Sequence, residues 1–165
     1  MDAPDRDLLR QLLTGTRVLS LGVLVDDKPH VGLLPYAVAP DFRSALVHAS
    51  QLARHGRGLR PGAPHSLLIH GADDPAGDPL QVPRVTISGT VQHVARSDRD
   101  WAAARQRYLD RFPTAERTFL LGDFNLYRLS FEWGRLVVGF ARAINLDPES
   151  FAARPGSREP AAEPH

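Results

Sequence analysis

Short runs in which apolar and polar residues alternate, separated by turn-forming residues, constrain the fold of this chain most. In the clearest run, Arg84–Val94, the apolar residues Val85, Ile87 and Val91 alternate with polar ones. A period of two is typical of a β-strand that buries one face and exposes the other. We therefore expect a mainly β protein.

The same criterion predicts six further strands, at residues 16–25, 30–38, 45–49, 66–69, 124–131 and 135–140. The turn Asp26-Asp27-Lys28-Pro29 predicts a hairpin between the first two strands, and Glu132-Trp133-Gly134 predicts a second hairpin between the last two. Pro35 lies inside a predicted strand, where a proline indicates an edge, a bulge or the end of pairing.

Helical spacing predicts three helices. Leucines at helical intervals place one at residues 5–14, and Ser50 is a suitable N-cap for another that runs to about Leu59. The third has Trp101, Tyr108 and Phe112 on one stripe and ends at Pro113. Short strands joined mostly by turns, with few helices between them, indicate a closed antiparallel barrel, which leaves no open sheet edge.

Composition predicts one domain, residues 1–148, followed by a tail, residues 149–165, too poor in apolar residues to become ordered. The chain has no cysteine, which excludes disulfides, thiolate nucleophiles and iron–sulfur clusters. A net charge of +1 argues against nucleic-acid and membrane-surface binding. The polar N-terminus and the lack of a long apolar stretch predict a cytoplasmic protein with no signal peptide.

No motif identifies catalytic residues, because the sequence has neither a nucleophile elbow nor a nucleotide-binding glycine loop. A metal site is not expected either. His48 and His55 are seven residues apart, and His65 and His70 fall on opposite faces of a predicted strand.

Residues 50–60 hold a dense cluster of polar and basic groups, namely Ser50, Arg54, His55, Arg57 and Arg60. Hydroxyl and guanidinium groups suit a phosphate monoester, although the same residues are also typical of a solvated helix face. Likewise, the polar strand face that begins at Arg84 either lines a cleft or faces solvent. Candidate residues for stacking on an aromatic cofactor are Tyr36, Trp101, Trp133 and Phe140.

Several segments together resemble a known family. They are LLPYAV (33–38), HASQLARHGRGL (48–59), PRVTISGTV (83–91), YLDRFP (108–113), LGDFNLYRL (121–129) and GRLVVGFARA (134–143). In order and spacing they resemble the split barrels of the pyridoxamine 5'-phosphate oxidase-like superfamily that bind flavin mononucleotide (FMN), nearest to the haem-utilisation branch. The resemblance implies a six-stranded antiparallel Greek-key split barrel and a homodimer that binds FMN in two interface clefts.

The resemblance also implies a set of FMN-binding residues. The segment Pro35, Tyr36 and Ala37 would pass beside the flavin ring, and His48, Ala49 and Ser50 would contact the ribityl chain and the ring edge. Arg54, His55 and Arg57 would hold the phosphate, and Arg84 would also reach the cofactor. The partner subunit would supply Gly139, Phe140 and Arg142.

Two departures from the family pattern narrow the expected activity. His55-Gly56-Arg57-Gly58 stands where the haem-utilisation branch has His-Thr-Arg-Asn, so backbone N–H groups at the glycines would have to replace two polar side chains. VVGFARA replaces the Arg-x-His substrate motif, so pyridoxamine 5'-phosphate oxidation is not expected. The resemblance favours an FMN-dependent oxidoreductase whose substrate and electron donor are unknown. A flavin or haem binding or trafficking protein without turnover and a deazaflavin-dependent reductase remain as alternatives.

Overall fold

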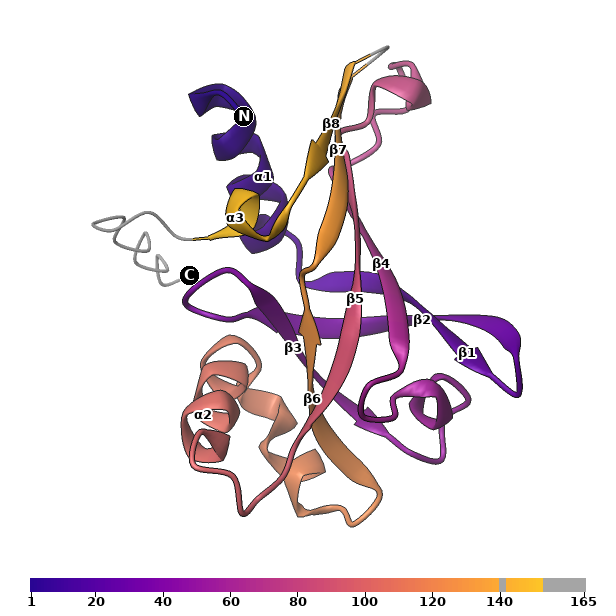
Figure 1. Ribbon diagram of the computed structural model, residues 1–165, viewed down its shortest axis with the longest axis vertical. Helices are drawn as coiled ribbons and strands as arrows, with labels where there is room; N and C mark the ends of the chain where they lie inside the picture. The colour runs from indigo at the N-terminus through magenta and orange to yellow at the C-terminus, as the bar shows by residue number, and fades with distance from the viewer. Residues whose placement is uncertain (140–141, 153–165) are drawn as a thin grey trace.

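The computed structural model describes residues 1–139 and 142–152, and in these residues strands dominate (Figure 1). The strands are β1 (Val18–Val25), β2 (Lys28–Val38), β3 (Ser44–Ser50), β4 (Pro64–His70), β5 (Arg84–Val94), β6 (Phe124–Ser130), β7 (Trp133–Gly139) and β8 (Arg142–Leu146). The helices are α1 (Ala3–Gly15), α2 (Trp101–Arg111) and α3 (Pro148–Phe151), with short 3-10 turns η1 (His55–Gly58), η2 (Pro79–Gln81) and η3 (Pro113–Leu120).

Six strands close into an antiparallel barrel, which confirms the predicted fold. The strands follow one another in the order β4-β1-β2-β3-β6-β5, and pairing between β4 and β5 closes the ring. Within it, β4 lies beside β1 in the spatial order 4-1-2-3, which defines a Greek key. Strands β7 and β8 extend the sheet beyond the ring from the edge of β5 (Figure 1).

The first hairpin and its proline behave as predicted. Asp26 and Asp27 form the turn with φ values of 51° and 57°, the left-handed pair that a type I′ turn requires. Pro35 pairs with Val18 at the last position shared by β2 and β1, and pairing with β3 begins at Tyr36. The proline, which has no N–H to donate, therefore marks the place where β2 changes partner.

The predicted second hairpin is wrong, because β6 and β7 do not pair with each other in the described part of the chain. Both pair with β5 instead. β7 pairs with Arg84–Ser88 and β6 with Val91–Val94. The long strand β5 offers hydrogen-bonding positions to two partners in succession, and Gly89 lies where one partner gives way to the next.

Gly89 leaves no room for a side chain. A Cβ atom there would lie 2.0 Å from the backbone oxygen of Ser130, the last residue of β6. We expect Gly89→Ala to lower the free energy of unfolding by about 1–3 kcal/mol, the usual cost of overpacking. Chemical denaturation measures this loss. Gly122→Ala is the matched control, because a Cβ atom at Gly122 meets nothing within 4 Å. An equal effect of the two substitutions would contradict the close packing of β5 on the end of β6.

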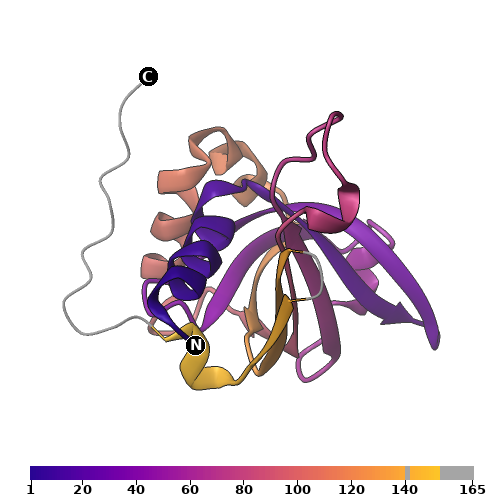
Figure 2. The ribbon, with the colours of Figure 1, turned by 90° about the horizontal axis from the view of Figure 1, so that it is seen from above.

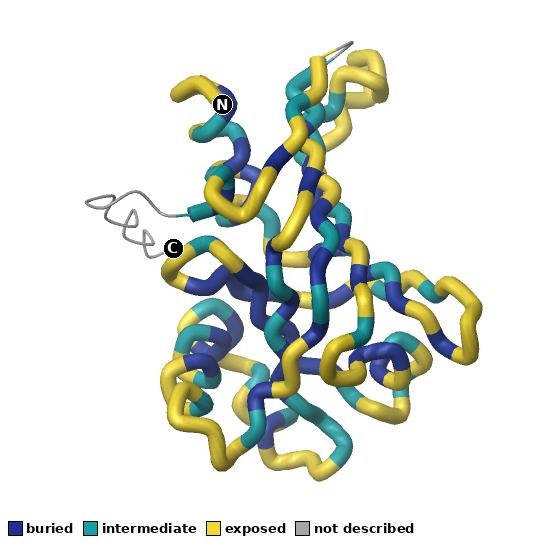
Figure 3. The backbone as a smooth tube through the Cα atoms, in the orientation of Figure 1, coloured by how far each residue is buried: buried dark blue, intermediate teal, exposed yellow. Residues whose placement is uncertain are grey.

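Two apolar clusters hold the fold together. Figure 3 marks the buried stretches of the chain in dark blue. The barrel interior is filled by alternate residues of the strands, and the predicted N-terminal helix packs on it through Leu9, Leu12 and Leu13. A second cluster lies between the sheet and α2 with η3, where Ala104 and Tyr108 of α2 pack against β3 and β6. The predicted helical stripe that contains these residues is therefore a core stripe.

The packed structure continues past the predicted domain boundary at residue 148. Strand β8 and helix α3 were not predicted, and Phe151 is fully buried, so residues 149–152 do not belong to a disordered tail. Helix α3 lies beside α1 (Figure 2), where the Arg10 side chain donates to the backbone oxygen of Ala152. The rest of the predicted tail, residues 153–165, lies outside the described residues.

Candidate functional site

The loop that follows β3 carries arginine side chains without partners. The helix predicted from Ser50 to Leu59 is wrong: turns and bends lead into the short η1. Arg54 and Arg57 are exposed, and the guanidinium group of neither has a hydrogen bond or an ion pair with the described residues. Two unneutralised guanidinium groups this close in sequence provide a local positive charge suited to an anion.

The two glycines of this loop are required by packing. A Cβ atom at Gly56 would lie 2.0 Å from the backbone oxygen of Ser50, and one at Gly58 would lie 2.7 Å from Val23. The N–H of Gly56 already donates to the oxygen of Ala53 at 2.9 Å. The expected replacement of polar side chains by free glycine N–H groups is therefore wrong at Gly56.

His55 begins η1 and rests on the β1–β2 hairpin. A Cβ atom at Gly32 would lie 2.8 Å from His55 Nδ1, so this glycine of β2 makes room for the imidazole. The side chain is half-buried, and burial lowers its pKa below the usual histidine value. His55 therefore acts here mainly as a neutral group that fixes the loop on the barrel.

The β2 segment next to this loop exposes few of the residues expected to face a flavin. Pro35 is exposed, but the side chains of Tyr36 and Ala37 are buried. The Tyr36 hydroxyl donates to the Leu13 backbone oxygen at 2.9 Å and lies 2.8 Å from Thr16 Oγ1. The expectation that the Tyr36 ring stacks on a cofactor is therefore wrong, because that ring belongs to the core.

The end of β3 is fastened to β6. Ser50 pairs with Phe124, and its hydroxyl donates to the carboxylate of Asp123 while accepting from the N–H of Leu52 at 3.1 Å. The neighbouring Ala49 is buried. Asp123 was not predicted as a site residue, because only the pairing of β3 with β6 brings it to Ser50.

His48 lies on the same side of β3 as Ser50, but η3 covers it. Its imidazole stacks on Phe119 with 3.8 Å between ring centroids and 10° between planes. Burial, assisted by the nearby Arg96 charge, lowers the pKa of His48 from 6.5 to about 4. The imidazole is therefore neutral near pH 7 and lies beneath the helical layer.

Arg84, Gly139 and Arg142 form a separate cluster with Arg135 and Val137 around a cavity of about 470 Å³. Arg142 forms an ion pair with the buried Asp5 at 2.7 Å, and Arg84 donates to the Val82 backbone oxygen at 3.1 Å. Phe140, which the sequence also assigns to the site, lies outside the described residues.

Within a single chain, this arginine cluster and the loop after β3 lie apart from each other. Arg84 pairs with His70 at the last position of β4, whereas η1 packs on Val23 of β1, which pairs with His65 near the start of β4. In Figure 1, η2 and the ends of β7 and β8 lie at the top of the molecule, away from the β1–β2 hairpin. The candidate residues therefore form two groups.

Exposed apolar side chains flank the first group. Val31 and Leu33 of β2 are 77% and 68% exposed, Leu52 in the loop after β3 is 79% exposed, and Leu120 at the end of η3 is 82% exposed. Val31 and Leu33 lie on one face of β2, and neighbouring exposed apolar side chains of this kind occur at surfaces that contact a ligand or another protein. Trp133, another candidate for stacking, is also half-exposed at the start of β7.

Within the described residues, no three histidine, aspartate or glutamate side chains gather so as to hold a metal ion. No described helix is long and apolar enough to cross a membrane.

The fold and this placement of groups define a class: an antiparallel split barrel with a basic loop after its third strand. Solved structures of similar fold match the chain. A heme binding protein from Mycobacterium smegmatis is 25% identical over 92% of this chain and 61% of its own, with a TM-score of 0.78. HutZ, the heme storage protein from Vibrio cholerae, is 24% identical over 79% and 92%, with a TM-score of 0.68. A Clostridium acetobutylicum protein of the pyridoxinephosphate oxidase family, related to general stress protein 26, is 14% identical over 92% and 99%, with a TM-score of 0.66.

No protein-family model and no curated protein matches the sequence. The chain has the split-barrel fold of the pyridoxamine 5'-phosphate oxidase-like proteins and resembles them near their haem-utilisation branch. It spans 61% of the length of the mycobacterial protein.

Proposed function

We propose that this protein binds FMN between two copies of the chain and acts as an oxidoreductase through that flavin. The observation that carries the proposal is the pair of unpartnered arginines, Arg54 and Arg57, beside the exposed apolar residues of β2. A phosphate monoester needs cationic groups such as the two arginines, and the face of a flavin ring packs favourably on apolar side chains.

The residues present fit such a ligand. Arg54 and Arg57 would pair with the phosphate, and His55 would hold the loop that carries them. Leu33 and Pro35 of β2 would pack against the ring and exclude water from one of its faces. Bound FMN would supply hydride and electron transfer, so no nucleophilic side chain is needed. The side chains of Tyr36, Ala37, His48 and Ala49 are buried, so contacts from those positions would come from the backbone.

A second copy of the chain would complete the site. Arg84, Gly139 and Arg142 lie too far along the barrel to join the loop of their own chain, whereas a two-fold axis brings two different patches together twice. The exposed side chains of Val31 and Leu33 would become buried in that interface.

The cofactor prediction concerns Arg57. We expect Arg57→Ala to weaken FMN binding about 10- to 100-fold, the range for a lost hydrogen bond to a charged group. Titration of the purified chain with FMN, followed by quenching of flavin fluorescence, measures the dissociation constant. Arg99→Ala is the matched control, because Arg99 is also exposed but lies outside the loop. An unchanged affinity of the Arg57 variant would remove this arginine from the phosphate site, and no FMN uptake by the parent chain would reject the proposal.

The dimer prediction is tested by mass. Sedimentation equilibrium of the full chain should give twice 18.2 kDa, and Leu33→Asp should shift the population toward the single-chain mass. The charge would have to be buried in the interface without a partner, which costs far more than leaving it in water. A single-chain mass for the parent at all concentrations would reject the shared site.

Haem binding is the second candidate, because two of the similar structures are named for heme binding and heme storage. Extraction of the purified protein followed by mass measurement distinguishes FMN, a deazaflavin and haem. Haem titration then gives a visible absorption band characteristic of the protein-bound iron if haem is the ligand. Saturation by FMN with no haem uptake would favour the flavin.

A further inference from the structure

A small cavity beneath η3 and the start of α2 is not part of the flavin site proposed above. Its volume is about 130 Å³, and its walls include Trp101, Phe119, Phe124, His48, Arg96 and Asn125. An apolar cavity of roughly 150 Å³ is large enough to bind benzene, so one six-membered ring is the size of ligand that fits.

The hydrogen bonds around His48 fix which ring nitrogen carries its proton. Thr118 has one hydroxyl hydrogen, which it donates to the Ala115 backbone oxygen at 2.8 Å. The contact of 3.1 Å between Thr118 Oγ1 and His48 Nδ1 therefore needs its hydrogen from the imidazole. In the neutral ring, Nε2 is then a hydrogen-bond acceptor.

That acceptor is left without a donor. The His48 side chain is more than nine-tenths buried, and no hydrogen bond from the described residues reaches Nε2. Nε2 is not fully enclosed by the protein, unlike the buried polar atoms that have no partner. It therefore remains accessible from the cavity that His48 lines. A ligand that fits this position must offer an O–H or N–H donor.

The charge in the wall selects among such ligands. The Arg96 guanidinium donates to the Phe119 backbone oxygen at 2.7 Å and lies 5.7 Å from the Trp101 ring centroid. It forms no ion pair with a carboxylate in the described residues. This cation disfavours a second positive charge, so a neutral donor fits this position better than a protonated amine, and it stabilises an oxygen that gains negative character when its proton is shared.

We infer that this cavity binds a single-ring phenol, whose hydroxyl donates to His48 Nε2 while the ring packs against Phe124 and Trp101. The inference does not depend on flavin binding, since none of the unpartnered loop arginines lines the cavity.

Phenol and toluene are the probes that test it, because they have nearly the same shape and differ in the donor. Calorimetric titration of the full chain should give a dissociation constant below about 1 mM for phenol and one about 5- to 10-fold higher for toluene, the factor for one hydrogen bond. In His48→Phe that difference should vanish. In His70→Phe, which removes an exposed imidazole elsewhere, it should persist. Equal binding of both probes to the parent chain, or no phenol binding at 10 mM (on the order of ten times the expected constant), would overturn the inference.

A measurement on the parent chain decides the case even where His48→Phe does not fold. Nitrogen-15 spectra of the imidazole rings should show the His48 Nε2 resonance shifting upfield on addition of phenol, as an acceptor nitrogen does, with no change at His70. Binding that leaves both His48 and His93, the two histidines of the cavity, unchanged would place phenol elsewhere, and a shift of His93 without one of His48 would reject the hydrogen bond to Nε2.

Discussion

Replacing Phe151 with alanine should lower the free energy of unfolding by about 3–5 kcal/mol, the usual cost of truncating a buried phenylalanine. Its side chain is fully buried in the barrel core, with its ring centroid 5.2 Å from that of Phe131. The tip of the Phe151 ring is also closely packed, since a Cβ atom added at Gly134 would lie 2.9 Å from Phe151 Cζ. Such rigid surroundings cannot collapse into the space that the ring leaves.

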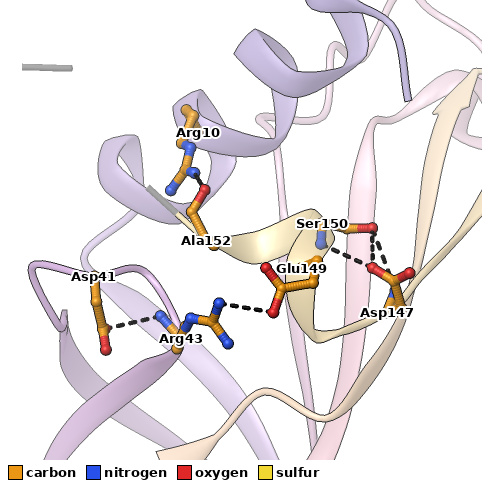
Figure 4. A network of polar contacts seen from close by, with 7 residues as sticks. All are labelled: Arg10, Asp41, Arg43, Asp147, Glu149, Ser150 and Ala152. Atoms are coloured by element: carbon orange, nitrogen blue, oxygen red, sulfur yellow. Dashed lines mark hydrogen bonds and ion pairs between the residues drawn. The ribbon is translucent and has the colours of Figure 1, made fainter. Parts of the chain in front are cut away.

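The contacts that hold α3 in place explain why a short helix carries so much packing energy (Figure 4). Asp147 caps the helix by accepting from the N–H of Ser150 at 2.8 Å. Glu149 forms an ion pair with Arg43 at 2.8 Å, and Arg10 of α1 holds the oxygen of Ala152. These polar contacts position Phe151, and its burial supplies the energy.

Glu149→Ala is the control for this prediction, measured by the same urea denaturation of the full chain. Its carboxylate is 77% exposed, and exposed ion pairs contribute at most about 1 kcal/mol. A loss below 1 kcal/mol for Phe151→Ala, on the order of the control, would show that α3 is only loosely attached.

The sequence predicts the barrel well because its strands carry their signals locally. The alternation in Arg84–Val94 gives both the strand and its buried face, with Val85, Ile87 and Val91 fully inside. Pro35 indicates where β2 changes its pairing partner, because a proline has no N–H to donate and so interrupts pairing at its own position. In each case the determining chemistry lies within the segment itself.

Predictions fail where a distant segment decides the structure. The turn residues between β6 and β7 suggest a hairpin, but β5 offers both strands a partner, and that competition is invisible in residues 124–140. Phe151 is a single aromatic residue in a segment with the composition of a tail, so its own segment does not predict its burial. The ring is buried because Gly134, which has no side chain, leaves room for it. Local patterns do not encode such long-range fits.

The candidate site also has a part that the local sequence predicts and a part that depends on distant segments. The basic loop was found from its own sequence, and Arg54 and Arg57 are exposed as a phosphate site requires. The surroundings of His48 could not be found, because Thr118 and Phe119 come from a turn about seventy residues later. Arg84 was assigned to the same group as the loop, yet the topology places it with Arg142.

Acidification should destabilise the protein before its carboxylates titrate, chiefly through His48. Burial and Arg96 lower the pKa of His48 from 6.5 to about 4 in the folded chain. As the pH falls, the unfolded chain takes up this proton first, so the stability linked to His48 is complete above pH 6.5 and is lost between pH 6.5 and 4. At about 1.4 kcal/mol for each unit of pKa difference, the loss approaches about 3 kcal/mol at pH 4.

Urea denaturation at pH 7 and at pH 4.5 measures the effect, and His48→Phe isolates it, because a phenyl ring can still stack on Phe119 but cannot titrate. Between these pH values the parent chain should lose about 2–3 kcal/mol more than the variant. His65 is also buried with a lowered pKa, so the variant keeps some acid sensitivity in the same direction. His70→Phe, a substitution at an exposed position outside the cavity, should follow the parent chain. An identical loss in the parent chain and His48→Phe would mean that His48 takes up its proton in the folded protein as readily as in the unfolded one, and that the cavity beneath η3 is open to water.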